Sequence, residues 1–187
     1  MTLSRSCAST ACALGVDTGA AAAGEGADRV YSTITWRLGA DIEQLYLTGS
    51  GSANAIGNGL DNVLVGNSRG NVIVGGAGRD LMTGGAGADR FDFDAVSEST
   101  LSASDRIADL AAEDVIDLST IDANSLVAGN QAFTLVSAFT GAAGQLTLTY
   151  NARGGFTVLD ADINGDRVAD FRVLLTGDHS DYDNFRL

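Results

Sequence analysis

Four consecutive nine-residue rows, which run from Gly57 to Asp92, decide how this chain folds. They read GNGLDNVLV (57–65), GNSRGNVIV (66–74), GGAGRDLMT (75–83) and GGAGADRFD (84–92). The last two rows match the pattern Gly-Gly-x-Gly-x-Asp-x-U-x, in which U is a large apolar residue. Each row holds a six-residue turn and a three-residue strand, and this repeat predicts a stack of short parallel strands.

The turn and the strand of each row have different tasks. Glycines in the turn accept backbone angles that a Cβ forbids, and they leave carbonyl oxygens accessible. In the strand, side chains alternate, so Met82 and Phe91 should point inward while Leu81 and Arg90 point outward. A three-residue strand cannot bury a face alone, and the rows must therefore stack on one another.

Stacking brings aspartates of successive coils together at one edge. Asp80 and Asp89 hold the sixth position of the two consensus turns. Unpaired like charges repel at that distance, and a hard divalent cation with roughly six to eight oxygen ligands would relieve the repulsion. Calcium accepts an irregular set of carbonyl and carboxylate oxygens more readily than magnesium does. The rows therefore predict calcium, with plain glycine turns as the alternative.

The rows resemble those of the RTX family, whose hemolysin-type calcium-binding repeats form a parallel β-roll. In that family one coil spans two rows, which implies that turn 75–80 faces turn 57–62 and turn 84–89 faces turn 66–71. The resemblance further implies several calcium ions, held by the carboxylates of Asp80 and Asp89 and by turn carbonyls. The carbonyls expected to take part belong to Gly75, Ala77, Gly78, Gly84, Ala86 and Gly87.

The first two rows are degenerate. Asn62 and Asn71 replace the aspartate, and Arg69 stands where the fourth-position glycine belongs. An amide can ligate calcium but brings no charge, so we expect weaker half-sites there. The other ligands of these half-sites would come from Gly57, Gly59 and Gly66.

The composition is strongly acidic. Across 187 residues the formal net charge is −13, with 24 Asp and Glu against 11 Lys and Arg, and proline is absent. Such a chain should repel nucleic acid and anionic membranes. No stretch approaches the roughly 18–20 apolar residues that a membrane span requires. Without calcium the repulsion would oppose compaction, which favours a disordered metal-free chain.

We expect an all-β chain in three parts. Residues 1–23 would be a flexible lead-in, and its two cysteines, Cys7 and Cys12, have no zinc-site pattern and read as incidental thiols or an adventitious disulfide. Residues 24–125 would form the parallel β-roll, with 57–92 as its calcium-binding core. Residues 126–187 would form an antiparallel β-sandwich cap, because strand-like stretches recur between 131 and 175.

The segment after the repeats resembles the end of the roll in serralysin-type C-terminal domains and in alginate epimerase R-modules. The stretches SDRIADL (104–110) and DVIDLS (114–119) carry this resemblance, which covers roughly residues 24–187. It implies that Asp105 and Asp109 cap the last calcium row. A solvated turn acid or a helix N-cap is the alternative for these two residues.

A second acidic cluster, DADINGDRVAD (160–170), partly satisfies the calcium loop of an EF-hand. Phe171 stands at loop position twelve in place of glutamate, and the flanks are strand-like. Because Asn-Gly-Asp between alternating apolar residues is also a hairpin signal, we predict a hairpin, with a weak extra calcium site as the alternative.

The residues do not support catalysis. The chain has a single histidine, His179, so a His-x-x-x-His zinc site is excluded, and no Gly-x-Ser-x-Gly elbow is present. His179 lies in TGDHSDYD (176–183), a stretch that looks structural in the resembling domains. Serralysin catalysis belongs to a separate N-terminal domain in that family.

Three functions therefore remain open. The first is a calcium-folded module of a secreted bacterial protein that supports type I secretion and extracellular folding of an attached or lost enzyme; the acidic tail HSDYDNFRL (179–187) resembles such export signals. The second is a carbohydrate-binding module for an anionic, alginate-like polysaccharide. The third is a small secreted hydrolase that uses His179. The second would need arginines on one face, although the simpler interpretation is that the arginines balance neighbouring aspartates. The candidates are Arg29, Arg37, Arg69, Arg79, Arg90 and Arg106.

Overall fold

The computed structural model describes residues 15–17 and 27–187, and the chain is all-β within these ranges, as predicted. The 3₁₀ turn Val96–Glu98 is the sole helical element there, and no helix in these ranges has the length and apolar character to cross a bilayer. Cys7, Cys12 and most of the predicted lead-in lie outside the described residues. Strand β1 (Gly15–Asp17) pairs antiparallel with β2 (Arg29–Ser32).

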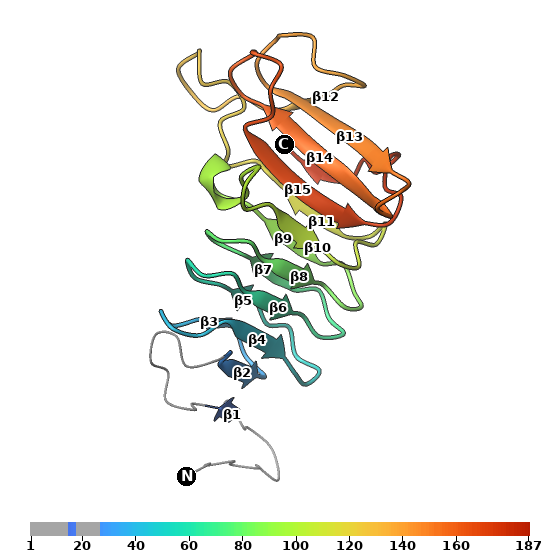
Figure 1. The fold of residues 1–187 in the computed structure, drawn as a ribbon. Helices are drawn as coiled ribbons and strands as arrows, with labels where there is room; N and C mark the ends of the chain where they lie inside the picture. Colours follow the sequence, from blue (N-terminus) through green and yellow to red (C-terminus); the bar gives the residue numbers. More distant parts are fainter. Residues whose placement is uncertain (1–14, 18–26) are drawn as a thin grey trace.

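The repeats form two parallel sheets, and successive strands alternate between them (Figure 1). The longer sheet, here called the long sheet, holds β2, β4 (Gln44–Leu47), β6 (Val63–Val65), β8 (Leu81–Thr83) and β10 (Asp105–Ile107). The short sheet holds β3 (Trp36–Arg37), β5 (Ala55–Ile56), β7 (Val72–Val74), β9 (Arg90–Asp92) and β11 (Val115–Asp117). This arrangement is the predicted parallel β-roll.

The pairing register places the turns against one another. Val63 pairs with Leu81, one coil of 18 residues later. Leu81 then pairs with Arg106, because the last coil is lengthened to 25 residues. Turn 75–80 therefore faces turn 57–62, and turn 84–89 faces turn 66–71, as the resemblance implied.

The core is a column of inward side chains between the two sheets. Leu64, Ile73, Met82 and Phe91 have no exposed surface. Leu81, the neighbour of Met82, is exposed on the outer face of the long sheet. The strand alternation predicted for Met82 and Phe91 is thus confirmed, and successive rows bury one large apolar side chain each.

The antiparallel strands of the cap continue the long sheet and do not form a separate body (Figure 1). β15 (Phe171–Thr176) pairs in parallel with β10 and antiparallel with β14 (Phe156–Asp162). β14 pairs antiparallel with β13 (Gln145–Asn151), whose other neighbour is β12 (Thr134–Leu135). The cap is therefore anchored to the roll through β10.

The predicted hairpin at the second acidic cluster is confirmed by the pairing of β14 with β15. Asp162 is fully buried at its base, and its carboxylate accepts hydrogen bonds from the amides of Gly165 (2.7 Å) and Arg167 (2.9 Å). Asp170 accepts from the amide of Ile163 at 3.0 Å. These carboxylates hold the turn together through backbone amides.

The C-terminal tail closes the short sheet. β16 (Phe185–Arg186) pairs in parallel with β11 and forms the edge of that sheet. The buried Asp117 carboxylate accepts from Arg90 at 3.0 Å and from Arg186 at 3.2 Å. The Tyr182 hydroxyl donates to the carbonyl of Asp114 at 2.8 Å, so the tail is bonded to the end of the roll.

Candidate functional site: two ladders of buried aspartates

Equivalent residues of the stacked turns form two ladders, one on each edge of the roll. Every member is a buried Asn or Asp, with at most 2 % of its surface exposed. The first ladder is Asn62, Asp80 and Asp105, and the second ladder is Asn71, Asp89 and Asp114. The side chains within a ladder are separated by one coil.

One oxygen of each ladder aspartate is fixed by the preceding coil. Oδ1 accepts a hydrogen bond from the backbone amide of the ladder residue one coil earlier. These distances are 2.7 Å from Asn62 to Asp80, 2.8 Å from Asp80 to Asp105, 2.8 Å from Asn71 to Asp89 and 2.9 Å from Asp89 to Asp114. In the folded roll, backbone amides therefore orient these carboxylates.

The other oxygen of three ladder aspartates lacks a partner within the described part of the chain. Oδ2 of Asp80, Asp89 and Asp105 is buried and accepts no hydrogen bond there. Burial raises the pKa of Asp80 to about 7, that of Asp89 to about 6 and that of Asp105 to about 8. The hydrogen bond from a backbone amide lowers each of these pKa values, but the effect of burial is larger. A buried, unpaired carboxylate oxygen is costly and needs a proton or a cation.

Glycines hold these oxygens at the interface between turns. A Cβ on Gly75 would overlap Oδ2 of Asp80, so this oxygen lies against the first glycine of its own turn. A Cβ on Gly57 would overlap the carbonyl oxygen of Gly75, so that carbonyl lies against the facing turn. Carboxylate and carbonyl oxygens thus gather around backbone that lacks side chains. The second ladder repeats these contacts with Gly66, Gly84 and Asp89.

In the degenerate turns, the side-chain oxygen of the ladder asparagine accepts a hydrogen bond from a backbone amide of its own turn. In turn 57–62, Oδ1 of Asn62 accepts from the amide of Asn58 at 2.8 Å, and in turn 66–71 the Asn71 side chain accepts from Asn67 and donates to the carbonyl of Ala53 in the preceding coil. In the consensus turn 75–80, Gly76 replaces Asn58 and adopts φ +87°. Of these four turns, the two consensus turns leave a carboxylate oxygen unpaired and the two degenerate turns do not, which fits the expected weakness of the degenerate half-sites.

The remaining predicted ligands lie in the same turns with different exposure. Gly57, Gly66, Gly75 and Gly84 are buried, and Gly59, Ala77 and Ala86 are exposed. Gly78 and Gly87 adopt φ +125° and +113°, which L side chains rarely reach. The sequence argument named Gly57 and Gly59 of the facing turn but not Asn58 and Leu60. A Cβ on Gly76 or Gly78 would overlap the carbonyl oxygen of Asn58 or Leu60.

Asp105 and Asp109 both lie at the end of the roll, in different positions. Asp105 belongs to the first ladder, whereas Asp109 accepts from the amides of Gly84 (2.8 Å) and Gly85 (2.9 Å). Asp114 ends the second ladder and was missed. Asp114 follows Asp89 by 25 residues, as Asp105 follows Asp80, and this shared separation becomes visible in the structure.

No three or more His, Cys, Asp or Glu side chains converge on a metal-sized space in residues 15–17 and 27–187. A cation at a ladder would therefore draw on backbone carbonyls as well as on carboxylates. An all-oxygen donor set with irregular geometry and buried, oriented carboxylates fits calcium better than magnesium, which demands a near-octahedral shell, or zinc, which prefers nitrogen and sulfur.

The structure also places the candidate arginines and His179. The six arginines considered for one basic face do not share a face, because Arg29 and Arg106 lie on the long sheet, whereas Arg37 and Arg90 lie on the short sheet. His179 is half-buried, and its Nε2 lies 2.9 Å from the carbonyl oxygen of Thr176. Because a carbonyl only accepts, that nitrogen carries the proton and holds the local turn.

Comparisons with known proteins agree with this geometry. Residues 11–186 match the family model described as peptidase M10 serralysin C terminal. Metalloprotease AprA of Pseudomonas entomophila is 51 % identical over 140 residues, and metallopeptidase AprA of Pseudomonas marginalis is 49 % identical over 140 residues. Each alignment covers 74 % of this chain, which spans 28 % of the relative's length.

Solved structures give the same result. The AlgE6R3 subunit of the Azotobacter vinelandii mannuronan C5-epimerase matches with a TM-score of 0.52 and 26 % identity, over 76 % of both chains. The AlgE6R2 subunit of that enzyme matches with the same TM-score and identity, over 71 % of this chain and 79 % of the subunit.

Proposed function

Because this chain belongs to the peptidase M10 serralysin C-terminal family, we propose that it is a calcium-binding module whose folding depends on Ca²⁺. The observation that carries this proposal is the set of buried, unpaired Oδ2 atoms on Asp80, Asp89 and Asp105. Calcium would supply the positive charge that lets these carboxylates stay ionised in the interior.

The chain's own residues prepare each site. Amides of the preceding coil hold Oδ1 of Asp80 and Asp89, so Oδ2 points at a fixed place. The first-position glycines let that oxygen and the facing carbonyls approach. We assign the ligands to the two carboxylates and to carbonyls of turns 57–62, 66–71, 75–80 and 84–89, with Asp105 completing the first ladder. Binding several ions would then join one coil to the next.

Calcium dependence would also delay folding until after export. Extracellular calcium modules bind with dissociation constants of about 10⁻⁴–10⁻³ M, far above the calcium level of a cell interior. An unfolded chain with an accessible C-terminal tail suits type I secretion, and the similar relatives are proteases that extend well beyond the matched segment. We therefore propose that the module supports secretion and extracellular folding of an attached or lost enzyme.

Calcium titration of the purified chain tests this function directly. We expect the far-UV circular dichroism of β-structure to rise cooperatively with calcium, with magnesium at the same concentrations producing little change, because the site lacks an octahedral shell. A chain that is fully folded in chelator and does not gain thermal stability from calcium would contradict the proposal.

The pKa values predict opposite pH dependences with and without calcium. In the metal-free chain, Asp80, Asp89 and Asp105 have folded-state pKa values of about 7, 6 and 8, above the ordinary value near 4. The stability they contribute is therefore present below about pH 4 and is lost as pH rises through 6 to 8. With calcium, acid should destabilise, because protons displace the ion. Thermal unfolding between pH 5 and 8, with chelator and with saturating calcium, measures both slopes; parallel slopes would contradict the assignment.

A second function, binding of an anionic polysaccharide, is favoured by one comparison. The R-module neighbours are subunits of an enzyme that acts on mannuronan, and they share the fold at 26 % identity. Hydrolysis through His179 is not proposed, because the imidazole ring of His179 is hydrogen-bonded to the backbone carbonyl of Thr176.

A further inference from the structure

Two hollows adjoin on the outer face of the long sheet, where the cap joins the roll. Each has a volume of about 420 Å³, and Leu101 lines both. The cap hollow lies over β13–β15, and the residues that matter below are Ser137, Phe139, Thr147, Thr149, Asp160 and Arg172. The roll hollow lies over β8 and β10, and those that matter are Arg79, Leu81, Arg106 and Leu174.

Two arginines of the roll hollow, Arg79 and Arg106, form no ion pair within the described part of the protein, and the carboxylate that lines the hollow, that of Asp80, is buried. Ion pairs in residues 15–17 and 27–187 involve only Arg90, Arg172 and Arg186. Arg79 donates to the carbonyl of Ser102 at 2.9 Å, and the guanidinium of Arg106 lies 5.4 Å from the ring centroid of Phe156. In a chain of net charge −13, two arginines beside one hollow without a carboxylate partner complement an anionic ligand.

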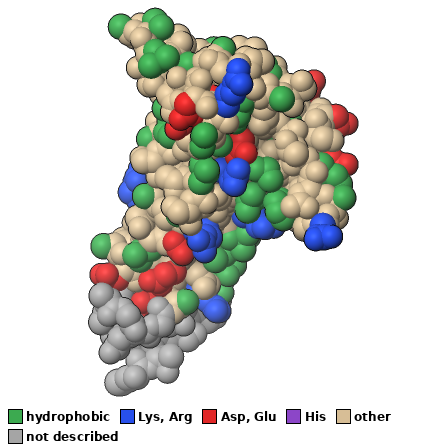
Figure 2. Space-filling view, turned by 45° about the horizontal axis from the view of Figure 1, so that its top comes forward, with side chains coloured by type: hydrophobic (Ala, Val, Ile, Leu, Met, Phe, Trp, Pro, Cys, Tyr) green, Lys and Arg blue, Asp and Glu red, His purple; other side chains and the backbone are tan. Residues whose placement is uncertain are grey.

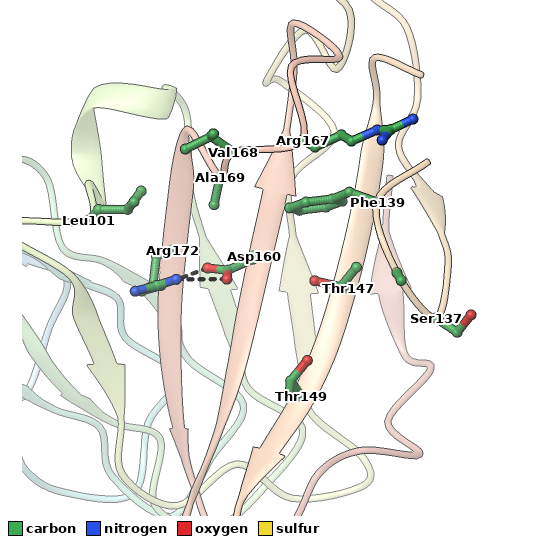
Figure 3. Close-up of a pocket in the computed structure, with 11 residues that line it drawn as sticks. Leu101, Ser137, Phe139, Thr147, Thr149, Asp160, Arg167, Val168, Ala169 and Arg172 are labelled. Carbon is green, nitrogen blue, oxygen red and sulfur yellow. Dashed lines mark hydrogen bonds and ion pairs between the residues drawn. The ribbon is translucent and has the colours of Figure 1, made fainter. Parts of the chain in front are cut away.

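The cap hollow has the chemistry of a sugar subsite. Asp160 and Arg172 form a bidentate ion pair, with hydrogen bonds of 2.7 and 2.8 Å (Figure 3). This pair fixes polar groups at the base of the cap hollow. Thr147 and Phe139 point into the same space. A rigid polar pair, hydroxyl groups and an aromatic ring suit the hydroxyls and the apolar face of a pyranose ring.

The strand pairing favours a sugar over a peptide. Acidic peptides commonly add as a strand to a free sheet edge, where main-chain groups are unpaired. Here β14 and β15 are paired on both sides, by β13 and β10, so these strands offer no free edge to a peptide. Figure 2 shows that basic and hydrophobic side chains lie near one another on the face of the molecule that it draws.

We propose that the two hollows form one binding site for a carboxylated polysaccharide, a polyuronate. Its carboxylates would bind Arg79 and Arg106, and its rings would lie against Leu81, Leu101 and Phe139. This inference gives the second proposed function its site and its ligand class. It rests on the folded roll, because Asp80 of the first ladder also lines the roll hollow.

The test is binding of oligomannuronate, in chains too short to gel, to the whole chain in saturating calcium. The double variant Arg79→Gln with Arg106→Gln should weaken binding by about tenfold or more, because each loses a charged hydrogen bond. The matched double Arg37→Gln with Arg69→Gln removes the same charge from the short sheet and the opposite edge. It should change affinity less than about twofold.

Circular dichroism of every variant in calcium separates the two proposals. A wild-type chain that folds with calcium yet does not bind oligomannuronate overturns the polyuronate site and leaves the calcium proposal intact. Equal losses in both double variants would overturn it too, because binding would then follow net charge alone. Tighter binding of polyglutamate than of oligomannuronate would assign the hollows to an acidic peptide, and equal binding of neutral dextran would remove the role of the arginines. A chain without a calcium response overturns the calcium proposal instead.

Discussion

Replacing both consensus aspartates, Asp80→Asn with Asp89→Asn, should remove most of the calcium response and at the same time stabilise the metal-free chain. In the absence of the ion each carboxylate buries a charge whose Oδ2 has no partner. Removing the two charges should raise the metal-free stability by about 2 kcal/mol or more. Removing them also removes the charged ligands on which calcium binding depends.

Asparagine already stands at the equivalent position of both degenerate turns, where its Oδ1 accepts from an amide of its own turn. Asn62 and Asn71 occupy the equivalent place one coil earlier and are buried to the same extent as Asp80 and Asp89. The asparagine variant can keep the backbone hydrogen bond at Oδ1, so the fold should survive. The double substitution should therefore raise stability without calcium and lower it with calcium. A merely structural role of the carboxylates would not give these opposite effects.

Calcium titration followed by circular dichroism, together with thermal unfolding in chelator, measures both effects. The control is Asp41→Asn with Asp181→Asn, two exposed positions outside the ladders that carry the same change in charge. A double ladder variant that keeps the wild-type calcium midpoint would exclude these two carboxylates as ligands.

Adding one methyl group at two glycines of the same turn should have very different effects on stability. We expect Gly57→Ala to destabilise the fold strongly and Gly59→Ala to leave its stability nearly unchanged. A Cβ on Gly57 would overlap the carbonyl oxygen of Gly75 in the next coil, and that carbonyl is backbone and cannot rotate away. A Cβ on Gly59 meets nothing within 4 Å. We expect Gly57→Ala to cost about 3 kcal/mol, and Gly59→Ala less than about 0.5 kcal/mol.

Denaturant unfolding in saturating calcium compares the two variants under conditions in which the wild type is folded. Because the substitution is identical and the two positions are two residues apart, differences in the unfolded chain are small. Equal stability of the two variants would contradict the close stacking of turns 57–62 and 75–80. Gly66→Ala, at the same place in the second ladder, should behave like Gly57→Ala.

Much of the roll could be predicted because its period is local. The nine-residue row determines which side chains point inward, and two rows per coil determine which turns face each other; Met82 and turn 75–80 follow directly. The family resemblance, confirmed by the family model and by the similar proteases, added the cap. The predicted division at residues 23 and 125 stays a prediction.

The parts that could not be predicted depend on long-range pairing. The lengthened last coil moves Asp105 and Asp114 into register with the aspartates 25 residues before them, and no short motif marks that step. The side to which an arginine points depends on which sheet holds its strand, so Arg37 and Arg106 could not be assigned to faces by spacing along the chain. The unpaired oxygens became visible only once burial and hydrogen bonds were known.

The tail has a protective role that follows from its place at the edge of the short sheet. Without β16, strand β11 would present a free row of amides and carbonyls, the kind of edge that joins sheets of separate molecules into aggregates. Tyr182 binds the carbonyl of Asp114, whose carboxylate already holds the amide of Asp89. The tail therefore depends for its contacts on a folded last coil. A half-folded molecule keeps this edge open, and molecules crowded together at that stage would risk joining into fibres.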